Sequence, residues 1–177
     1  MRVTISSKVS KKLAKRLSSA SNFFAGLLMD PRMVRDLNIE IKLLRKLEGM
    51  GFCEVIDSGK PRRKYIIEIL NDGQNDPIET LAHEMVHVKQ YAKKEIGREV
   101  PIVAGTVSEN PADYITQWKG KFWNPKSKED PYFDSPWEIE AYGRGFGLYE
   151  RWQDLNPPKP VRRAKRKPKS RKKKTTK

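Results

Sequence analysis

The two histidines of this chain lie four residues apart, in the segment HEMVH at residues 83–87, and the 177-residue sequence contains no others. Residues i and i+4 share one face of a helix, so His83 and His87 can bind a single cation there. Glu84 would then lie beside the open coordination position and take a proton from the attacking water. The segment therefore predicts a helix that carries a hydrolytic zinc site.

The residues around this segment predict the helix itself. Asp76 is a typical N-cap, a proline follows it at the first helical position, and a glutamate stands three residues after the cap. The helix should run to about Lys93, and Val86 and Tyr91 make its second face too apolar for a solvated surface. We therefore expect burial on both sides, with the histidines pointing away from an apolar stripe of Ile78, Leu81, Ala82, Met85, Val88 and Ala92.

A catalytic zinc site usually has three protein ligands, so a third must come from elsewhere in the chain. With no histidine left, it must be a carboxylate or Cys53. Residues 135–142, SPWEIEAY, carry the cap, proline and glutamate that begin a second helix. Glu138 and Glu140 are its candidate ligands. They flank an apolar stripe of Trp137, Ala141, Leu148, Trp152 and Leu155 on opposite sides, so periodicity does not choose between them.

Each candidate also has an ordinary structural role open to it. Glu138 could close a capping box with Ser135. Glu140 could be a solvated helix charge paired with Arg144 one turn later. Cys53 lies among apolar residues and is expected to be a small buried side chain.

The motif HEMVH, followed about fifty residues later by WEIEAY, resembles the minimal zincin metallopeptidases with a glutamate third ligand. This group includes phage and bacterial SprT-like proteins and the ImmA/IrrE-type peptidases, and the resemblance covers about residues 60–150. It implies a zinc-dependent peptidase in which a Glu-x-x-Ala helix supplies the third ligand, here Glu138. SprT and Spartan proteins proper differ, since they use a third histidine and a cysteine zinc ribbon.

The predicted fold is α+β, a small zincin-like domain in which a short sheet is backed by an N-terminal helix and the HExxH helix. Residues 52–56 and 64–70 are predicted strands joined by a turn at 58–61, and residues 39–43 are a strand or the end of a helix. The N-terminal helix should turn Leu13, Leu17, Phe24 and Leu27 inward and a basic cluster of Lys8, Lys11, Lys12, Lys15 and Arg16 toward solvent.

The resemblance also implies a strand for substrate binding, because zincins pair an edge strand with the extended substrate backbone. Residues 66–70 are expected in that role, and an interior strand is the alternative. Beyond the zinc helix, residues 117–123 are predicted to form a strand, and residues 109–111 a loop.

The second predicted helix contains three alternating glycines at residues 143–147. They do not match a phosphate-binding loop, and we expect them to permit close packing against the zinc helix. Tyr142 and Arg144 lie nearby in sequence and are candidate stabilisers of the oxyanion.

Charge divides the chain into a predicted zincin-like domain, residues 1–156, and a Lys/Arg-rich tail, residues 157–177. The tail holds twelve basic residues and no acid, whereas the other 25 basic and 22 acidic residues leave only +3. With little to bury, the tail should be disordered, and it should bind DNA or RNA phosphates. A solubility tail, a nuclear-localisation signal and an anionic-membrane patch are alternatives. The expected contacts are Arg162, Arg163, Lys165, Arg166, Lys167, Lys169, Arg171, Lys172, Lys173 and Lys174.

These features predict a zinc metallopeptidase of protein or peptide substrates, brought to nucleic acid by its tail. A regulatory peptidase that cuts one repressor is a further possibility. The alternative is a non-catalytic nucleic-acid-binding or virion-associated protein with a structural zincin fold. No secretory signal or long apolar run is evident, so a cytoplasmic protein is expected, in the host if viral, or nuclear if eukaryotic.

Overall fold

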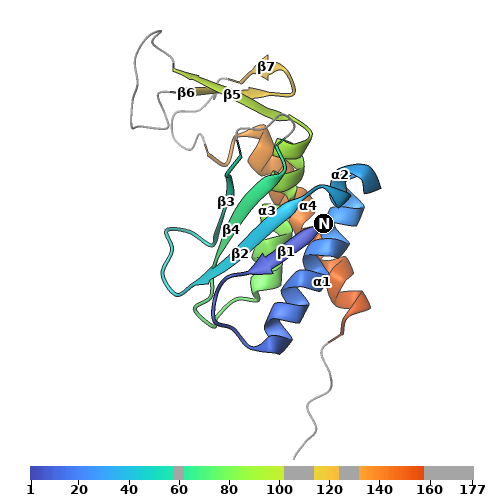
Figure 1. Cartoon of the computed structure of the whole chain (residues 1–177). Helices are drawn as coiled ribbons and strands as arrows, with labels where there is room; N and C mark the ends of the chain where they lie inside the picture. The colour runs from blue at the N-terminus through green and yellow to red at the C-terminus, as the bar shows by residue number, and fades with distance from the viewer. Residues whose placement is uncertain (58–61, 102–113, 124–131, 158–177) are drawn as a thin grey trace, which may run out of the picture.

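The computed structural model describes residues 1–57, 62–101, 114–123 and 132–157. These residues form four helices, a four-stranded sheet and a three-stranded sheet, so the predicted α+β class is confirmed (Figure 1). The predicted turn at 58–61, the loop at 109–111 and the basic contacts of the tail lie outside the described residues.

The larger sheet has the strand order β1-β2-β4-β3. Its strands are β1 (Arg2–Ile5), β2 (Asn38–Leu44), β3 (Gly51–Val55) and β4 (Lys64–Leu70). β2 runs parallel to both β1 and β4, whereas β3 pairs with β4 antiparallel, with Cys53 opposite Ile67. The two predicted strands therefore pair as expected, and the ambiguous segment at 39–43 is a strand. β1 was not predicted, because four residues carry too short a pattern.

The prediction that residues 66–70 form an edge strand is wrong. β4 has a neighbour on each side, β2 and β3, and Tyr65, Ile67 and Ile69 are fully buried. Its nearly continuous apolar run is typical of such an interior strand. The antiparallel strand β3 is at the edge of the sheet instead.

Two long helices cover one face of this sheet, α1 (Lys11–Leu28) and α3 (Pro77–Ala92) (Figure 1). The short helix α2 (Pro31–Arg35) leads from α1 to β2. Leu17 and Phe24 of α1 are buried as predicted, but Leu27 is 41% exposed and does not face the core. Lys8 of the predicted basic cluster precedes the helix.

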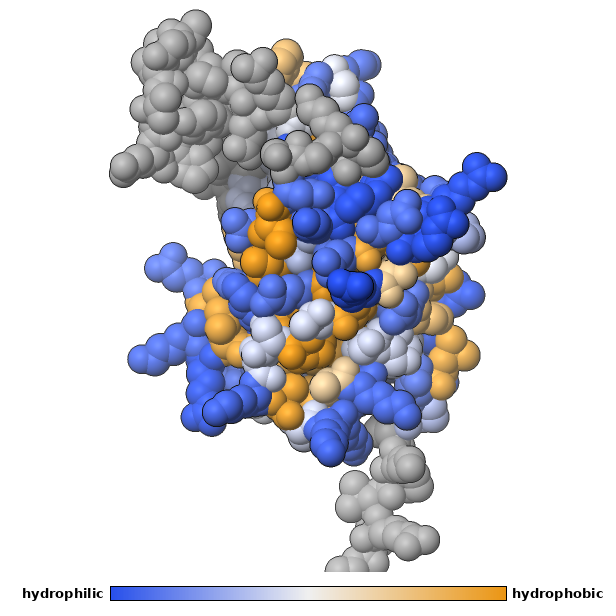
Figure 2. Space-filling model, viewed as in Figure 1, coloured by the Kyte–Doolittle hydropathy of each residue, from blue (hydrophilic) through white to orange (hydrophobic). Residues whose placement is uncertain are grey.

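The opposite face of the sheet has no helix over it among the described residues. Alternate residues of β2 and β4 there are half-buried, and Lys42 pairs with Glu68 across the strands at 3.4 Å. Figure 2 shows hydrophobic side chains between hydrophilic ones on this side of the molecule. The core therefore lies between the sheet and its helices.

Helix α3 begins and ends where its sequence predicts. The Asp76 carboxylate accepts a hydrogen bond from the Ile78 amide at 3.1 Å, Pro77 is the first helical residue, and Lys93 is the C-cap. The expected burial on both sides is also confirmed. The apolar residues facing the sheet and α1 are buried, and so are Glu84, His87, Lys89 and Gln90.

The second predicted helix is α4 (Pro136–Leu155), which packs mainly on α3. The smaller sheet lies near its N-terminal end and comprises β5 (Ile96–Pro101), β6 (Tyr114–Trp118) and β7 (Lys121–Phe122) (Figure 1). The single strand predicted at 117–123 is a hairpin, because Lys119 and Gly120 both adopt positive φ and turn the chain. Among the described residues, we find no helix that combines the length and hydropathy needed to cross a bilayer.

Of the three alternating glycines in α4, one makes the close approach that the sequence predicts. A Cβ added at Gly145 would lie 3.0 Å from the His83 Cα and 3.2 Å from the His83 amide nitrogen. The same atom added at Gly143 or Gly147 would meet nothing within 4 Å. Only Gly145 is therefore required by the packing of α4 against α3.

We predict that Gly145→Ala destabilises the protein by about 1–3 kcal/mol, because the new methyl group meets backbone atoms of α3 that cannot move independently. Gly147→Ala is the matched control, and it should leave stability unchanged or raise it by about 0.5–1 kcal/mol through helix propensity. Urea denaturation followed by circular dichroism measures both changes. Equal stabilities for the two variants would contradict the proposed contact.

Candidate metal site

Helices α3 and α4 bring three potential metal ligands together. The His83 and His87 Nε2 atoms are 3.1 Å apart, and each lies 3.3 Å from an oxygen of Glu138. Ligands placed about 2.0–2.1 Å from a zinc ion at tetrahedral corners would be separated by roughly 3.3 Å. His83, His87 and Glu138 are therefore spaced as a group that could hold one metal ion.

The Glu138 carboxylate is buried against the two imidazoles. It is 4% exposed, and its Oε2 atom has no hydrogen-bond partner among the described residues. Burial raises the pKa of this carboxyl, but contacts with His83 and His87 outweigh burial and lower the pKa to about 2. A buried, ionised carboxylate with a spare lone pair suits a cation, so the residues fit a metal.

Glu138 does not close the capping box that was its alternative role. Ser135 is the N-cap of α4, but its side chain makes no capping hydrogen bond and donates instead to the Tyr132 carbonyl at 2.7 Å. Because Glu138 does not fold back over the helix end, its side chain extends toward α3.

Glu140, the other candidate ligand, interacts with two basic side chains and not with the histidines. Its carboxylate accepts hydrogen bonds from Lys89 Nζ at 2.8 and 3.0 Å and pairs with Arg144 Nε at 3.0 Å. The predicted Glu140–Arg144 pair therefore exists, and neither side chain belongs to the possible metal group. Cys53 also lies outside that group, buried in β3 as expected.

Glu84, the candidate general base, lies in the same pocket as His83 and is only 4% exposed. Burial raises the pKa of its carboxyl, the two histidines lower it and Glu138 raises it again, with a net increase. Gly51, the first residue of the edge strand, makes room for this side chain. A Cβ at Gly51 would lie 2.5 Å from Glu84 Oε1, a constraint that the sequence pattern did not reveal.

A cleft of about 660 Å³ opens beside His83 and Glu84, between the start of β3 and helices α3 and α4. Much of its wall consists of large apolar side chains that are at least 44% exposed. These are Met50, Phe52, Tyr132, Phe133, Tyr142 and Phe146. Such a concentration of exposed apolar side chains around one cleft is typical of a binding surface.

Two phenols in this cleft lie near the possible metal group. The Tyr142 ring centre is 4.6 Å from that of His83. Burial raises the pKa of both Tyr132 and Tyr142, and the Glu138 carboxylate raises both further. Both phenols therefore remain protonated donors at neutral pH. Tyr142 was a candidate from its sequence position, whereas Tyr132 precedes α4 in a segment without a helical or strand pattern and was missed.

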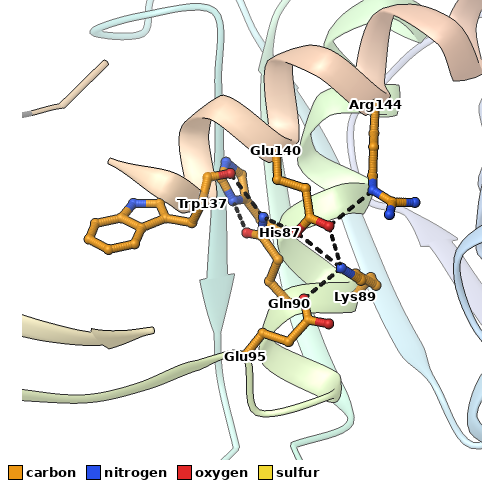
Figure 3. Close-up of polar contacts among 7 residues, drawn as sticks. All are labelled: His87, Lys89, Gln90, Glu95, Trp137, Glu140 and Arg144. Carbon is orange, nitrogen blue, oxygen red and sulfur yellow. Dashed lines mark hydrogen bonds and ion pairs between the residues drawn. The ribbon is translucent and has the colours of Figure 1, made fainter. Parts of the chain in front are cut away.

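His87 is held from behind by Gln90, which is fully buried (Figure 3). The Gln90 Oε1 atom lies 2.8 Å from His87 Nδ1, and its amide nitrogen donates to the Trp137 carbonyl at 2.9 Å and to Glu140 Oε2 at 3.1 Å. No sequence pattern indicated this role, because one glutamine in an amphipathic helix is usually a surface residue.

Comparisons of the chain with protein-family models, with curated proteins and with solved structures find no match. The resemblance to zincins therefore rests on the sequence motifs, and the structure adds a group of three side chains that could hold a metal ion.

We predict that Glu84→Gln stabilises the metal-free protein at neutral pH. The pKa of Glu84 is raised on folding, so its ionised form opposes folding, and this effect grows as pH rises through the folded pKa. A neutral amide avoids it, and each ~1 kcal/mol gained would raise the melting temperature by roughly 2–4 °C.

Thermal melts in chelator between pH 4 and 8 measure the difference, which should shrink toward pH 4. Glu79→Gln, which alters an exposed glutamate of the same helix, is the control and should give no such gain. A Glu84→Gln protein that is less stable than wild type at pH 8 would show that burial of this carboxylate is not the dominant effect.

Proposed function

We propose that this protein is a zinc-dependent metallopeptidase with a zincin-like fold, SprT-like in the broad sense. The observation that carries the proposal is the convergence of His83, His87 and Glu138, with Glu84 beside them at an open cleft. Two imidazole nitrogens and one carboxylate oxygen form a common catalytic zinc ligand set, which leaves one position for water or substrate. The edge strand next to this group also agrees with the zincin arrangement.

Each side chain of the site has a role in peptide hydrolysis. Zinc, when bound, would supply Lewis-acid activation of water and of the scissile carbonyl. Glu84 takes the proton from the attacking water and passes it to the leaving amine, and a pKa raised by burial makes it a better base. Tyr142 and Tyr132 are the candidate donors to the oxyanion. Arg144 is less suited, because Glu140 already binds its guanidinium.

The substrate that best fits the cleft is an extended polypeptide segment with a large apolar side chain. The edge strand β3 borders the cleft through Gly51 and Phe52 and could pair with an extended backbone. It takes the role first expected of residues 66–70. The surrounding aromatic side chains would then receive an apolar side chain of the substrate.

We predict that the wild-type protein binds one zinc per chain and cleaves an unfolded protein such as casein, and that Glu84→Gln lowers the cleavage rate by about 10²–10⁴-fold. The amide cannot accept the proton from water, but it leaves all three zinc ligands in place. Elemental analysis and a gel-based cleavage assay measure the two properties on the same samples.

His83→Ala is the control, and it should lose both zinc and activity. Zinc retained in Glu84→Gln with activity lost identifies Glu84 as the base. Undiminished cleavage by this variant would refute the mechanism, and wild-type protein that binds zinc without cleaving any substrate would favour the alternative, a structural zincin fold.

We further propose that residues 157–177 form a basic arm that brings the domain of residues 1–156 to nucleic acid in the cytoplasm. The support is the charge of the sequence, because twelve basic residues without an acid release counterions from a phosphate backbone and need no fixed structure. The arm contains no aromatic residue for base stacking, so phosphates are its expected contacts. Its substrates would then be proteins bound to the same nucleic acid.

We predict that deleting residues 157–177 abolishes DNA binding and any stimulation of cleavage by DNA, while cleavage of free casein stays within about twofold of wild type. The control is a tail of the same composition in scrambled order, which should retain binding because phosphate contacts depend on charge and not on sequence. Fluorescence anisotropy at several salt concentrations measures binding. Loss of binding with the scrambled tail would indicate a sequence-specific interaction instead.

A further inference from the structure

Gln90 connects His87, one of the three possible metal ligands, to helix α4 through one buried amide. Its oxygen lies against His87 on α3, and its nitrogen donates to the carbonyl of Trp137, the residue directly before Glu138 on α4 (Figure 3). We propose that Gln90, oriented by Glu140, is a positioning residue that presents His87 to the metal through Nε2. This inference rests on the proposed metal site.

The hydrogen-bond chemistry permits one orientation of the amide. The Trp137 carbonyl can only accept, and both Glu140 oxygens already face cationic donors from Lys89 and Arg144. The NH₂ group of Gln90 must therefore point toward Trp137 and Glu140, and its oxygen must point toward His87.

The orientation of Gln90 fixes the proton position on His87. An amide oxygen accepts only, so the Nδ1 atom of His87 must carry the hydrogen that it receives. The lone pair of the neutral ring is then on Nε2, the atom that faces His83 and Glu138. A ring with the other tautomer would present a hydrogen, not a lone pair, to the metal.

Glu140 can orient the Gln90 amide because its own carboxylate is held in place by two basic side chains. Its carboxylate lies between Arg144 and Lys89, and the Lys89 side chain is only 5% exposed. Lys89 also pairs with Glu95 at 2.6 Å (Figure 3). Two cations and two carboxylates therefore form a neutral cluster, and of the four only Glu140 accepts a hydrogen bond from the Gln90 side chain.

The matched pair Glu140→Gln and Glu95→Gln tests this arrangement. Each change removes one carboxylate from Lys89, but Glu140 is hydrogen-bonded to the Gln90 amide and Glu95 makes no hydrogen bond with that side chain. Gln90→Met removes the amide itself with little change in volume. Zinc affinity is measured by chelator competition on the full-length protein. The temperature is kept below the melting temperature of each metal-free variant, so that every variant is folded during the measurement.

Gln90→Met is expected to weaken zinc binding by about 10–100-fold, as for other residues that orient metal-bound histidines. Glu140→Gln should weaken it by a smaller factor, and Glu95→Gln should stay within about twofold of wild type. The visible spectrum of the cobalt-loaded protein should change in Gln90→Met, which a merely structural role would not require. In the double variant Gln90→Met/Glu140→Gln, the second substitution should cause no further loss of zinc affinity, because the effect of Glu140 passes through Gln90.

The outcomes separate this inference from the proposed function. Wild-type affinity and an unchanged cobalt spectrum in Gln90→Met would overturn the role of Gln90 while leaving the metal site intact. Additive losses in the double variant would show that Glu140 does not act through Gln90. A wild-type protein that binds neither zinc nor cobalt would overturn the proposed function, and this inference with it.

Discussion

The contact of α4 with α3 at Gly145 is the constraint on which the site depends. Without a side chain at Gly145, the backbones can approach until this residue lies against His83. Glu138 lies seven residues earlier, or about two helical turns, so both residues share one face of α4. The close contact that brings Gly145 to His83 therefore also brings the Glu138 carboxylate to the two imidazoles. A larger residue would separate the helices and the ligands together.

The buried face of α4 explains why the sequence alone did not choose between Glu138 and Glu140. The stripe expected from apolar residues included Trp137 and Leu155, but Leu155 is 65% exposed. The observed buried face consists of Glu138, Ala141, Gly145, Leu148 and Trp152. Two of its five positions are occupied by a carboxylate and a glycine, which a count of apolar residues passes over. Glu138 has the helical spacing of the buried residues Ala141, Leu148 and Trp152, and this spacing was the sequence feature that could have identified it as a buried ligand.

Local signals predicted helix boundaries well, because a cap, a proline and a periodic pattern act within a few residues. Asp76 and Ser135 mark the N-caps of α3 and α4, as expected. Strand order depends on pairing between distant segments, and it was not predicted. β4 was expected at the edge from the resemblance to zincins, yet it pairs with β2 on one side and with β3 on the other, which makes it interior. Tertiary contacts also determine the role of Gln90, which no local pattern distinguishes from a surface residue.

Two adjoining groups of charged side chains around α3 and α4 differ in how they are neutralised. Lys89, Arg144, Glu95 and Glu140 balance one another within the protein. Among the described residues, no lysine or arginine pairs with Glu84 or Glu138, so with neutral histidines the two carboxylates carry a charge of −2. Two protons or one divalent cation would cancel this charge, and an unbalanced buried charge is costly. The opposite pKa shifts of Glu84 and Glu138 agree with this view, because one carboxyl tends to gain a proton while the other keeps its charge against the histidines. The fold therefore maintains a deficit of positive charge where the three ligand atoms of His83, His87 and Glu138 converge.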